Sequence, residues 1–430
     1  MHKSQTFAGS MVALLSLGVV ACGSSSSPGP SSSGAELVFA GFNPFTGADA
    51  SFGPNMMAGC WPGVLALNQA GGVLGHKFTC VGVDTRGDPA DAVPAAEQLL
   101  ATTPNLVGII GPSSDEADAT VPIFEQAKIP MFADTGEASF DRSSYKFFWR
   151  LTPADDVKGY AMALWAQQHG YSRAAAIFAN DISSQSNVPT LVKAITKTGS
   201  TVVINERIAD NQPSYRTEVE RLIQASPQVM FMEAGPATDA TFLAELQQLH
   251  GLVTIIGTDA ALQSAWLTAV AGAIGESAMT QYFVGEQPYA PPGNAAYTVY
   301  LADLRASTAH VPMEKNWETD VYAMTNYDAV IVSGLAMIAA HSTDPGVFNS
   351  YITKVTEPGS GKVVVTNFPD GERALQAGKQ IQYVGAGGPI AFDPWHNSTG
   401  GFEFMKYTGH GQVAFEGEIT ALQIAQLVQR

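Results

Sequence analysis

Short β-rich runs alternate with longer helical segments from residue 37 onward. In the first half of the chain, strands are predicted at residues 37–40, 78–83, 106–110 and 130–133, with helices at 55–68, 89–101 and 117–127 between them. Strands that alternate with helices of this length imply right-handed βαβ crossovers and a mostly parallel sheet.

The same alternation repeats in the second half of the chain. Strands are predicted at residues 174–178, 202–205, 229–232 and 254–256, with helices at 157–168, 188–198, 215–225 and 238–249. Two α/β units in series predict two similar lobes that face a cleft. The size of the body agrees, because a single core rarely extends over about 400 residues.

Residues 1–22 have the pattern of an export signal. Lys3 precedes an apolar run at residues 11–20, and small residues stand just before Cys22. The run is too short to span a bilayer. This segment resembles the bacterial lipobox, which implies that Cys22 becomes the first residue and carries the acyl chains of a membrane anchor. The alternative is a plain secretory signal in which Cys22 is incidental.

Residues 23–35 contain seven serines, three glycines and two prolines, with no large apolar side chain. Such a segment buries too little surface to order itself, so we expect a flexible tether. No later apolar run reaches the length of about 18 residues that a spanning helix needs. We therefore expect a soluble extracytoplasmic body that is tethered from one end.

The chain carries 39 acidic and 22 basic residues, a net charge of −17. This balance opposes a nucleic-acid partner, which would favour a basic face, and we interpret the excess acid as a contribution to solubility. Cys60 and Cys80 are the two cysteines of the body. An even pair in an exported protein predicts one disulfide that closes a short loop, and two buried thiols are the alternative.

Loops that follow strands are the expected place for a ligand, because open α/β sheets bind ligands beyond the carboxyl ends of their strands. Three such loops carry polar residues, at 42–53, 111–115 and 133–137. Hydroxyl and backbone N–H groups at a helix start can hold a carboxylate without a cationic side chain. Ser113, Ser114 and Thr135 are candidates for this role, and simple helix capping is the alternative for each.

Several segments resemble the substrate-binding proteins of branched-chain amino-acid ABC transporters. These segments are residues 44–53, 105–140, 226–231, 326–330 and 388–393, and the resemblance extends over most of residues 36–415. It implies an α/β fold of two Rossmann-like lobes with mostly parallel sheets, joined by a triple-crossover hinge, as in type I periplasmic binding proteins.

The resemblance also implies a division of the chain and a function. Lobe 1 would comprise residues 36–152 and 280–394, and lobe 2 residues 153–279 and 395–430, with crossovers near 151–153, 278–281 and 392–395. The protein would capture a small amino-acid-like ligand between the lobes and deliver it to an ABC permease, with no cofactor. A sensing module for a membrane signalling partner is the alternative.

Binding roles follow from the resemblance position by position. Ser114 matches the serine that meets the ligand carboxylate, and Thr135 adds its backbone and hydroxyl. Phe52 stands where the family often has an aromatic wall. Asp259 matches the acidic residue of the second lobe that receives the ligand ammonium through a charge-assisted hydrogen bond, with a helix cap as the alternative. Ser113, next to Ser114, Ser184, in the loop 180–186, and Glu137, after Thr135, complete the expected binding set.

Three positions depart from the family pattern. Glu137 replaces a small hydroxyl residue, the loop 234–237 lacks an aromatic residue, and the loop 180–186 lacks a tyrosine-glycine pair. An anion at Glu137 would repel a ligand carboxylate unless a cation lies between them. Leucine, isoleucine and valine are therefore not assured, and another amino acid, a polyamine-like ligand or an amide remains open.

An enzyme is the rival class. The loop 111–115 loosely resembles a hydrolase nucleophile elbow but lacks the closing glycine of G-x-S-x-G. The sequence contains no H-E-x-x-H, clustered C-x-x-C, P-loop or Rossmann glycine fingerprint, so no motif supports metal or nucleotide chemistry. We therefore expect a binding protein without catalytic residues and without a metal.

Overall fold

The structure is a computed structural model that describes residues 34–47, 49–50, 52–289, 294–398 and 400–429. The predicted signal peptide, the lipidation site at Cys22 and most of the predicted tether lie outside the described residues. Gly34, at the end of that tether, already donates its N–H to the carbonyl of Gly75 at 3.0 Å. The described chain enters its first strand at Leu37.

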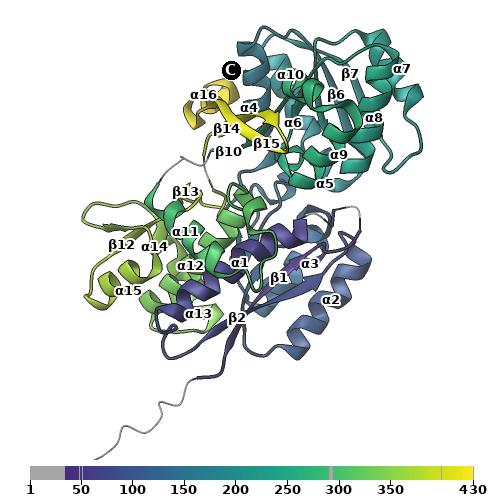
Figure 1. Ribbon diagram of the computed structural model, residues 1–430. Coiled ribbons are helices and arrows are strands. Elements are labelled where there is room, and N and C mark those ends of the chain that lie inside the picture. The colour runs from purple at the N-terminus through teal and green to yellow at the C-terminus, as the bar shows by residue number, and fades with distance from the viewer. Residues whose placement is uncertain (1–33, 48, 51, 290–293, 399, 430) are drawn as a thin grey trace, which may run out of the picture. The chain divides into compact units, whose positions relative to one another are not determined.

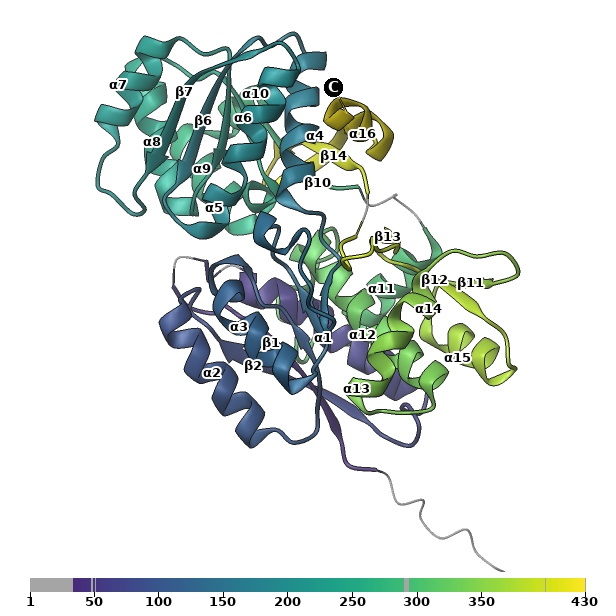
Figure 2. The same cartoon turned by 180° about the vertical axis from the view of Figure 1, so that it is seen from behind.

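Lobe 1 is built on a parallel five-stranded sheet in the order β2-β1-β3-β4-β5. Alternate residues of β1 enter different cores, with Phe39 in one and Val38 and Ala40 in the other. This alternation places α1 and α12 on one face and α2 and α3 on the opposite face (Figures 1 and 2). The elements are β1 (Leu37–Asn43), α1 (Phe52–Gln69), β2 (Phe78–Asp84), α2 (Pro89–Thr102), β3 (Leu106–Ile110), α3 (Ser114–Ala127), β4 (Met131–Ala133), β5 (Phe148–Arg150), α11 (Ala295–Ala306) and α12 (Val321–Ala340).

A smaller layer extends lobe 1 beyond α12. Its three-stranded sheet has the order β11-β12-β13. Asp328 of α12 ties this layer down, because it accepts hydrogen bonds from the Tyr383 hydroxyl at 2.8 Å and from the Ala386 N–H at 2.9 Å. The elements are α13 (Pro345–Phe348), α14 (Ile352–Thr356), β11 (Val363–Val365), α15 (Phe368–Gln376), β12 (Ile381–Gly385) and β13 (Gly388–Pro389).

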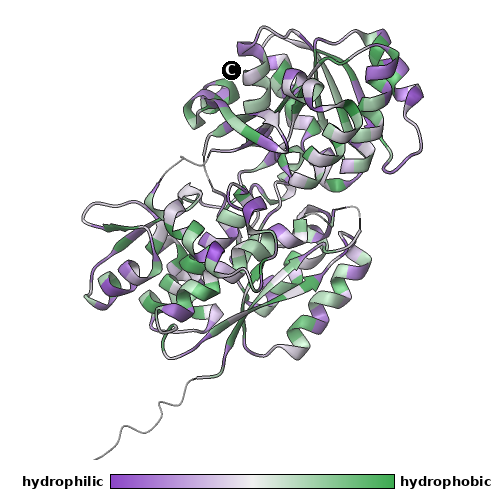
Figure 3. Cartoon of the chain, in the orientation of Figure 1, coloured by the Kyte–Doolittle hydropathy of each residue, from purple (hydrophilic) through white to green (hydrophobic). Residues whose placement is uncertain are grey.

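Lobe 2 is built on a seven-stranded sheet in the order β15-β14-β10-β9-β8-β6-β7. Strands β6 to β10 are parallel, and the β14–β15 hairpin adds two antiparallel strands to β10. The elements are α4 (Asp155–Gln168), β6 (Arg173–Ala179), α5 (Ile182–Ser186), α6 (Val188–Lys197), β7 (Thr201–Ile208), α7 (Arg216–Ala225), β8 (Val229–Glu233), α8 (Pro236–Leu249), β9 (Thr254–Gly257), α9 (Ser264–Ile274), α10 (Glu276–Tyr282), β10 (Phe283–Pro288), β14 (Phe402–Gly409), β15 (Gln412–Ile419) and α16 (Ala421–Gln429). The strands of both large sheets are mostly hydrophobic, as expected for sheets covered on both faces (Figure 3).

The first crossover between the lobes is where the sequence places it, since β5 ends at Arg150 and α4 begins at Asp155. The second differs. The expected crossover at 278–281 falls at α10, and β10 still belongs to the sheet of lobe 2, so the chain returns to lobe 1 only after Pro288. The third is also later than expected, because Asn397 still pairs with Arg150 of lobe 1.

One expectation about apolar runs is wrong. Among the described residues, α12 is long and apolar enough to cross a membrane by length and composition, and 83% of its most apolar window is buried inside the protein. It packs against α1 in the core of lobe 1. A helix that is apolar on all sides is expected in such a central position.

The predicted disulfide is confirmed. Cys60 of α1 is bonded to Cys80 of β2, across 20 positions of sequence. Both residues are buried in the core of lobe 1.

Candidate functional site

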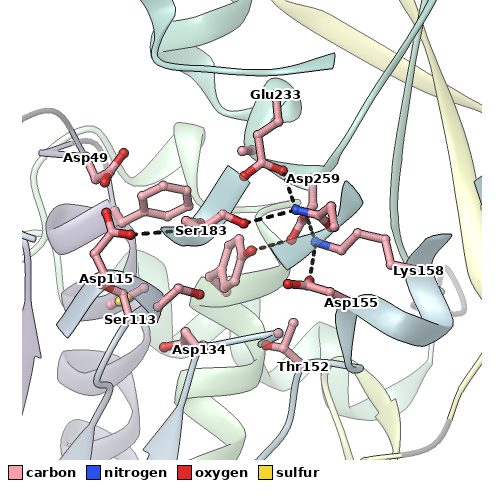
Figure 4. A pocket seen from close by; sticks show the side chains of 17 residues that line it. Asp49, Ser113, Asp115, Asp134, Thr152, Asp155, Lys158, Ser183, Glu233 and Asp259 are labelled. Atoms are coloured by element: carbon pink, nitrogen blue, oxygen red, sulfur yellow. Dashed lines mark hydrogen bonds and ion pairs between the residues drawn. The ribbon is translucent and has the colours of Figure 1, made fainter. Parts of the chain in front are cut away.

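The cleft consists of two adjoining pockets lined by loops and helix starts of both lobes, at the carboxyl ends of the parallel strands. The first is lined by Asp49, Phe52, Met56, Ser113, Ser114, Asp115, Asp134, Gly136, Thr152, Asp155, Lys158, Ser183, Asn187, Glu233, Asp259, Ala260 and Tyr322 (Figure 4). The second shares six of these residues and adds Arg86, Gly87, Asp181, Ser184, Asp210, Ala234, Gly235, Pro236, Gln263 and Trp266.

The structure brings most of the predicted binding residues together. Phe52, Ser113, Ser114 and Asp259 line the first pocket, and Ser184 lines the second. Thr135 and Glu137 line neither pocket. They are buried behind Ser114, whose hydroxyl donates to the Thr135 hydroxyl at 3.1 Å.

The hydroxyl groups of Ser113, Ser114 and Thr135 are hydrogen-bonded, directly or in sequence, to carboxyl groups of the protein. Ser113 is the N-cap residue of α3, and both its hydroxyl and its N–H donate to Glu116, at 2.9 and 3.1 Å. The hydrogen bond of Ser114 to Thr135 continues to the carboxyl of Glu137, to which Thr135 donates at 3.3 Å. These hydroxyl protons, expected to hold a ligand carboxylate, are therefore already shared with acidic side chains.

Asp259 is already paired with a cation of the protein. Its Oδ1 lies 2.7 Å from Lys158 Nζ, which also contacts Asp155 at 3.2 Å, and its Oδ2 accepts a hydrogen bond from the Tyr322 hydroxyl. Burial opposes the charge on Lys158, but the carboxylates of Asp259 and Asp155 outweigh it and raise the lysine pKa. Asp259 opens a short 3₁₀ turn at Asp259–Leu262, and its side chain is committed to the ion pair.

Glu233 and Asn187 form the next part of the wall. Asn187 Nδ2 donates to Glu233 Oε2 at 3.1 Å and to the Ser183 carbonyl at 3.2 Å. Burial raises the pKa of Glu233 to about 8, although the Lys158 charge acts in the opposite direction. Behind this wall, both carboxyl oxygens of the buried Glu286 have no hydrogen-bond partner among the described residues, and burial raises its pKa far above the usual range.

Asp49 and Asp115 mark the opposite end of the first pocket from Lys158 (Figure 4). Their carboxyl groups hydrogen-bond to each other, and burial together with the charge of Asp115 raises the pKa of Asp49 to about 9. Asp115 also accepts the N–H of Ser183 at 3.0 Å, a contact between the two lobes. Asp181 and Asp210 lie close by in the second pocket.

The resulting cleft is strongly acidic. Eight carboxyl residues line the two pockets: Asp49, Asp115, Asp134, Asp155, Asp181, Asp210, Glu233 and Asp259. The basic residues among the described lining are Lys158 and Arg86. The Arg86 side chain is 63% exposed and contacts Asp91 at 3.7 Å. No three His, Cys, Asp or Glu side chains of the described chain are arranged to hold a metal ion.

Sequence reasoning missed most of these acidic residues, because it followed the family positions. A signal was available. Open α/β sheets bind ligands at the carboxyl ends of their strands, and four of these acidic residues lie there. Glu233 is the last residue of β8, and Asp134, Asp181 and Asp259 follow within two residues of the ends of β4, β6 and β9. Lys158 carried no comparable signal, because its closer partner, Asp259, lies 101 positions away in the sequence and only Asp155 lies on the same helix, α4.

Two α/β lobes around a polar cleft define a solute-binding protein. The chain belongs to the periplasmic binding protein family, whose model matches residues 37–410. This family consists of ligand-binding transport proteins of the extracytoplasmic space, and the type I fold expected from the sequence is confirmed. No curated protein sequence matches the chain.

Solved structures share the fold at low sequence identity. A leucine-binding protein from Thermotoga maritima is 20% identical with a TM-score of 0.69, and the match covers 90% of this chain and 98% of that chain. A branched-chain amino-acid binding protein from Streptococcus pneumoniae in complex with isoleucine is 15% identical with a TM-score of 0.70, over 90% and 99% of the two chains. A solute-binding protein from R. palustris in complex with benzoate is 16% identical with a TM-score of 0.67, over 90% and 96%.

Proposed function

We propose that this protein is a lipid-anchored extracytoplasmic receptor that captures a small amino-acid-like ligand between its lobes and delivers it to an ABC permease. The observation that carries the proposal is a single cleft whose walls come from the strand ends of both lobes. A ligand that contacts both walls binds the closed arrangement more tightly than the open one and so increases the closed population. In this proposal the closed form is what the permease recognises.

The carboxyl residues that line the cleft favour a ligand with an ammonium group, which is the part that such a ligand shares with an amino acid. Glu233 and Asp115 accept hydrogen bonds from neighbouring amide or backbone donors, and neither forms an ion pair with a Lys or Arg of the described residues. A bound ammonium would supply charge-assisted hydrogen bonds to such groups. The contact of Asp115 with Ser183 brings the two lobes together at the same place, so a ligand there would touch both.

The test of this function is a thermal-shift screen of the mature protein against amino acids, amides, amines and aromatic acids. A ligand at a hundred times its dissociation constant should add about 2.7 kcal/mol to the free energy of unfolding. Small-angle scattering with the best compound should then show a smaller radius of gyration. If no compound in the panel stabilises the protein, the solute-capture proposal is wrong.

The anchor is tested separately by replacing Cys22 with serine and fractionating the cells. We expect the parent protein in the membrane fraction and Cys22→Ser outside it, because the sulfur that would carry the diacylglycerol is gone. Equal membrane retention of the two proteins would refute lipid anchoring at this residue and would leave solute capture unaffected.

A further inference from the structure

The acidic cleft defines the chemical class of the solute more narrowly than the family does. On the basis of the solute-capture function above, we propose that the ligand is an aliphatic amine with two positively charged groups and no free carboxylate. One group binds at Asp49 and Asp115, and the other binds beside Glu233 and Asn187.

The balance of charge in the cleft is the first support. Among the described residues, Asp155 and Asp259 are the acidic lining residues that contact a basic side chain, and both contact Lys158. The other six are Asp49, Asp115, Asp134, Asp181, Asp210 and Glu233, and no described Lys or Arg forms an ion pair with them. Buried carboxylates are costly unless they are protonated or paired with a cation.

The amide of Asn187 is independent support for a donor-rich ligand. This residue lines the first pocket and is only 2% exposed, and its Oδ1 has no hydrogen-bond partner among the described residues. Its Nδ2 is already used by Glu233 and the Ser183 carbonyl. A buried acceptor without a partner is destabilising, so the Asn187 amide oxygen favours a ligand that brings an N–H group to it.

The serine and threonine hydroxyl groups of lobe 1 disfavour a carboxylate on the ligand, because they already donate hydrogen bonds within the protein. Ser113 donates to Glu116, and the chain from Ser114 through Thr135 ends on Glu137. A ligand carboxylate placed against these residues would compete with the two protein carboxyl groups for the same protons. Lys158, the buried cation of the cleft, is already shared by Asp155 and Asp259.

The arrangement of the carboxyl groups favours two charges on the ligand over one. Asp49 and Asp115 lie at the opposite end of the first pocket from the Lys158 ion pairs, with Glu233 on the other lobe (Figure 4). A monoamine neutralises one of these positions and leaves the other without a cation. A diamine pairs with lobe 1 through Asp115 and with lobe 2 through Glu233, so both charges favour closure.

Calorimetry with the full-length mature protein tests the proposal. The probes are 1,4-diaminobutane, 1,5-diaminopentane, n-butylamine, lysine, leucine and benzoate. We expect a diamine to bind more tightly than n-butylamine by about tenfold or more, since a hydrogen bond to a charged group contributes about 1.5–3 kcal/mol. Lysine, which adds a carboxylate, should bind more weakly than the diamine of matching length.

Variants assign the binding to the acidic end. Asp115→Asn keeps an acceptor for the Ser183 N–H but removes the charge, and it should weaken diamine binding about tenfold with a smaller effect on n-butylamine. Asp49→Asn should act in the same direction. Glu97→Gln makes the same change of charge at an exposed position of α2, away from the cleft, and should leave the diamine affinity unchanged.

Two outcomes would overturn this inference and leave solute capture standing. One is leucine or benzoate binding at least as tightly as the diamines. The other is equal diamine affinity in Asp115→Asn, Asp49→Asn and Glu97→Gln, provided that all three variants unfold cooperatively. Failure of every probe and of the whole thermal-shift panel would instead reject the solute-capture function itself.

Discussion

Lys158 changes what Asp259 can do. Family position alone assigns Asp259 to the ligand ammonium, but in the structure its two oxygens contact Lys158 and the Tyr322 hydroxyl. The lysine therefore stands where a ligand ammonium was expected. It holds Asp155 and Asp259 together and leaves the remaining carboxyl groups of the cleft to the ligand.

Lys158→Met should destabilise the protein, because it leaves the buried Asp155 and Asp259 without their cation. Breaking a buried pair from one side costs about 3–5 kcal/mol, and urea unfolding at pH 7 should show a loss of this order. Lys193→Met, which removes an exposed lysine of α6, should change the free energy of unfolding by much less. Equal stability of the two variants would show that the ion pairs of Lys158 contribute nothing.

The start of α3 shows how one element combines a structural and a chemical task. Glu116 accepts hydrogen bonds from the Ser113 N–H and hydroxyl and from the Thr85 hydroxyl, all within 3.1 Å. Burial nevertheless outweighs these bonds and raises the pKa of Glu116 to about 7 from its usual 4.5. The helix end is thus held together by a carboxyl group that keeps its proton in weakly acidic solution.

This titration should be visible in the stability of the protein. Between pH 4.5 and 7 the unfolded chain releases a proton that folded Glu116 retains, so the free energy of unfolding falls as pH rises through this window. Glu116→Gln does not titrate. Its stability relative to the parent should therefore increase between pH 5 and pH 8, by roughly 2–3 kcal/mol at about 1.4 kcal/mol per pKa unit.

Urea unfolding of the two proteins at both pH values measures this difference, with Glu97→Gln as the exposed control. The control should keep a constant difference from the parent. A constant difference for Glu116→Gln as well, or one that shrinks with rising pH, would contradict the raised pKa of Glu116.

The disulfide joins two elements that are already neighbours in the core, α1 and β2. It closes a loop across 20 positions, for which the chain-entropy model gives a stabilisation of about 3 kcal/mol. Urea unfolding of the parent in the presence of reductant should show a loss of this order. The double variant Cys60→Ala, Cys80→Ala should be insensitive to reductant, and an equally insensitive parent would show that the bridge does not stabilise the fold.

At the scale of the whole molecule, the fold was largely predictable and the site was not. The alternation of strands and helices predicts four of the five parallel strands in each large sheet, because each βαβ unit carries its own local pattern, but it does not predict β5 and β10. The β14–β15 hairpin does not follow this alternation, so it was missed, and the late position of the second crossover depends on β10 pairing with β9 and β14. The ion pair between Lys158 and Asp259 could not be predicted, because the two residues lie 101 positions apart and only the packing of the fold brings them together.

The net charge of −17 also has a different meaning once the molecule is folded. Exposed acidic residues contribute to solubility, but eight of the carboxyl residues line the cleft instead. Acidic residues that lie far apart in the sequence thus meet in one cleft, because parallel strands end at the same edge of a sheet. A cleft lined by one sign of charge attracts ligands of the opposite sign.

Ligand binding should therefore release protons. At pH 7 Asp49 and Glu233, with pKa values of about 9 and about 8, are largely protonated, and burial raises the pKa of Asp115 as well. The charged groups that act on them are Asp181 beside Asp49 and Asp115, and Lys158, Asp259 and Asp155 beside Glu233. A bound diamine stabilises the ionised carboxylates and lowers their pKa values, so protons leave the cleft as the ligand enters.

Calorimetry of diamine binding at pH 7 in phosphate and in MOPS measures this release, because the two buffers differ in their heat of protonation. The apparent binding enthalpy should be more exothermic in MOPS, which gives off more heat when it accepts the released protons. Asp49→Asn should reduce the difference between the buffers, and Glu97→Gln should preserve it. Equal enthalpies in the two buffers for the parent protein would mean that the carboxyl groups keep their protons in the complex, and the ligand would then be recognised by their neutral forms and not by charge.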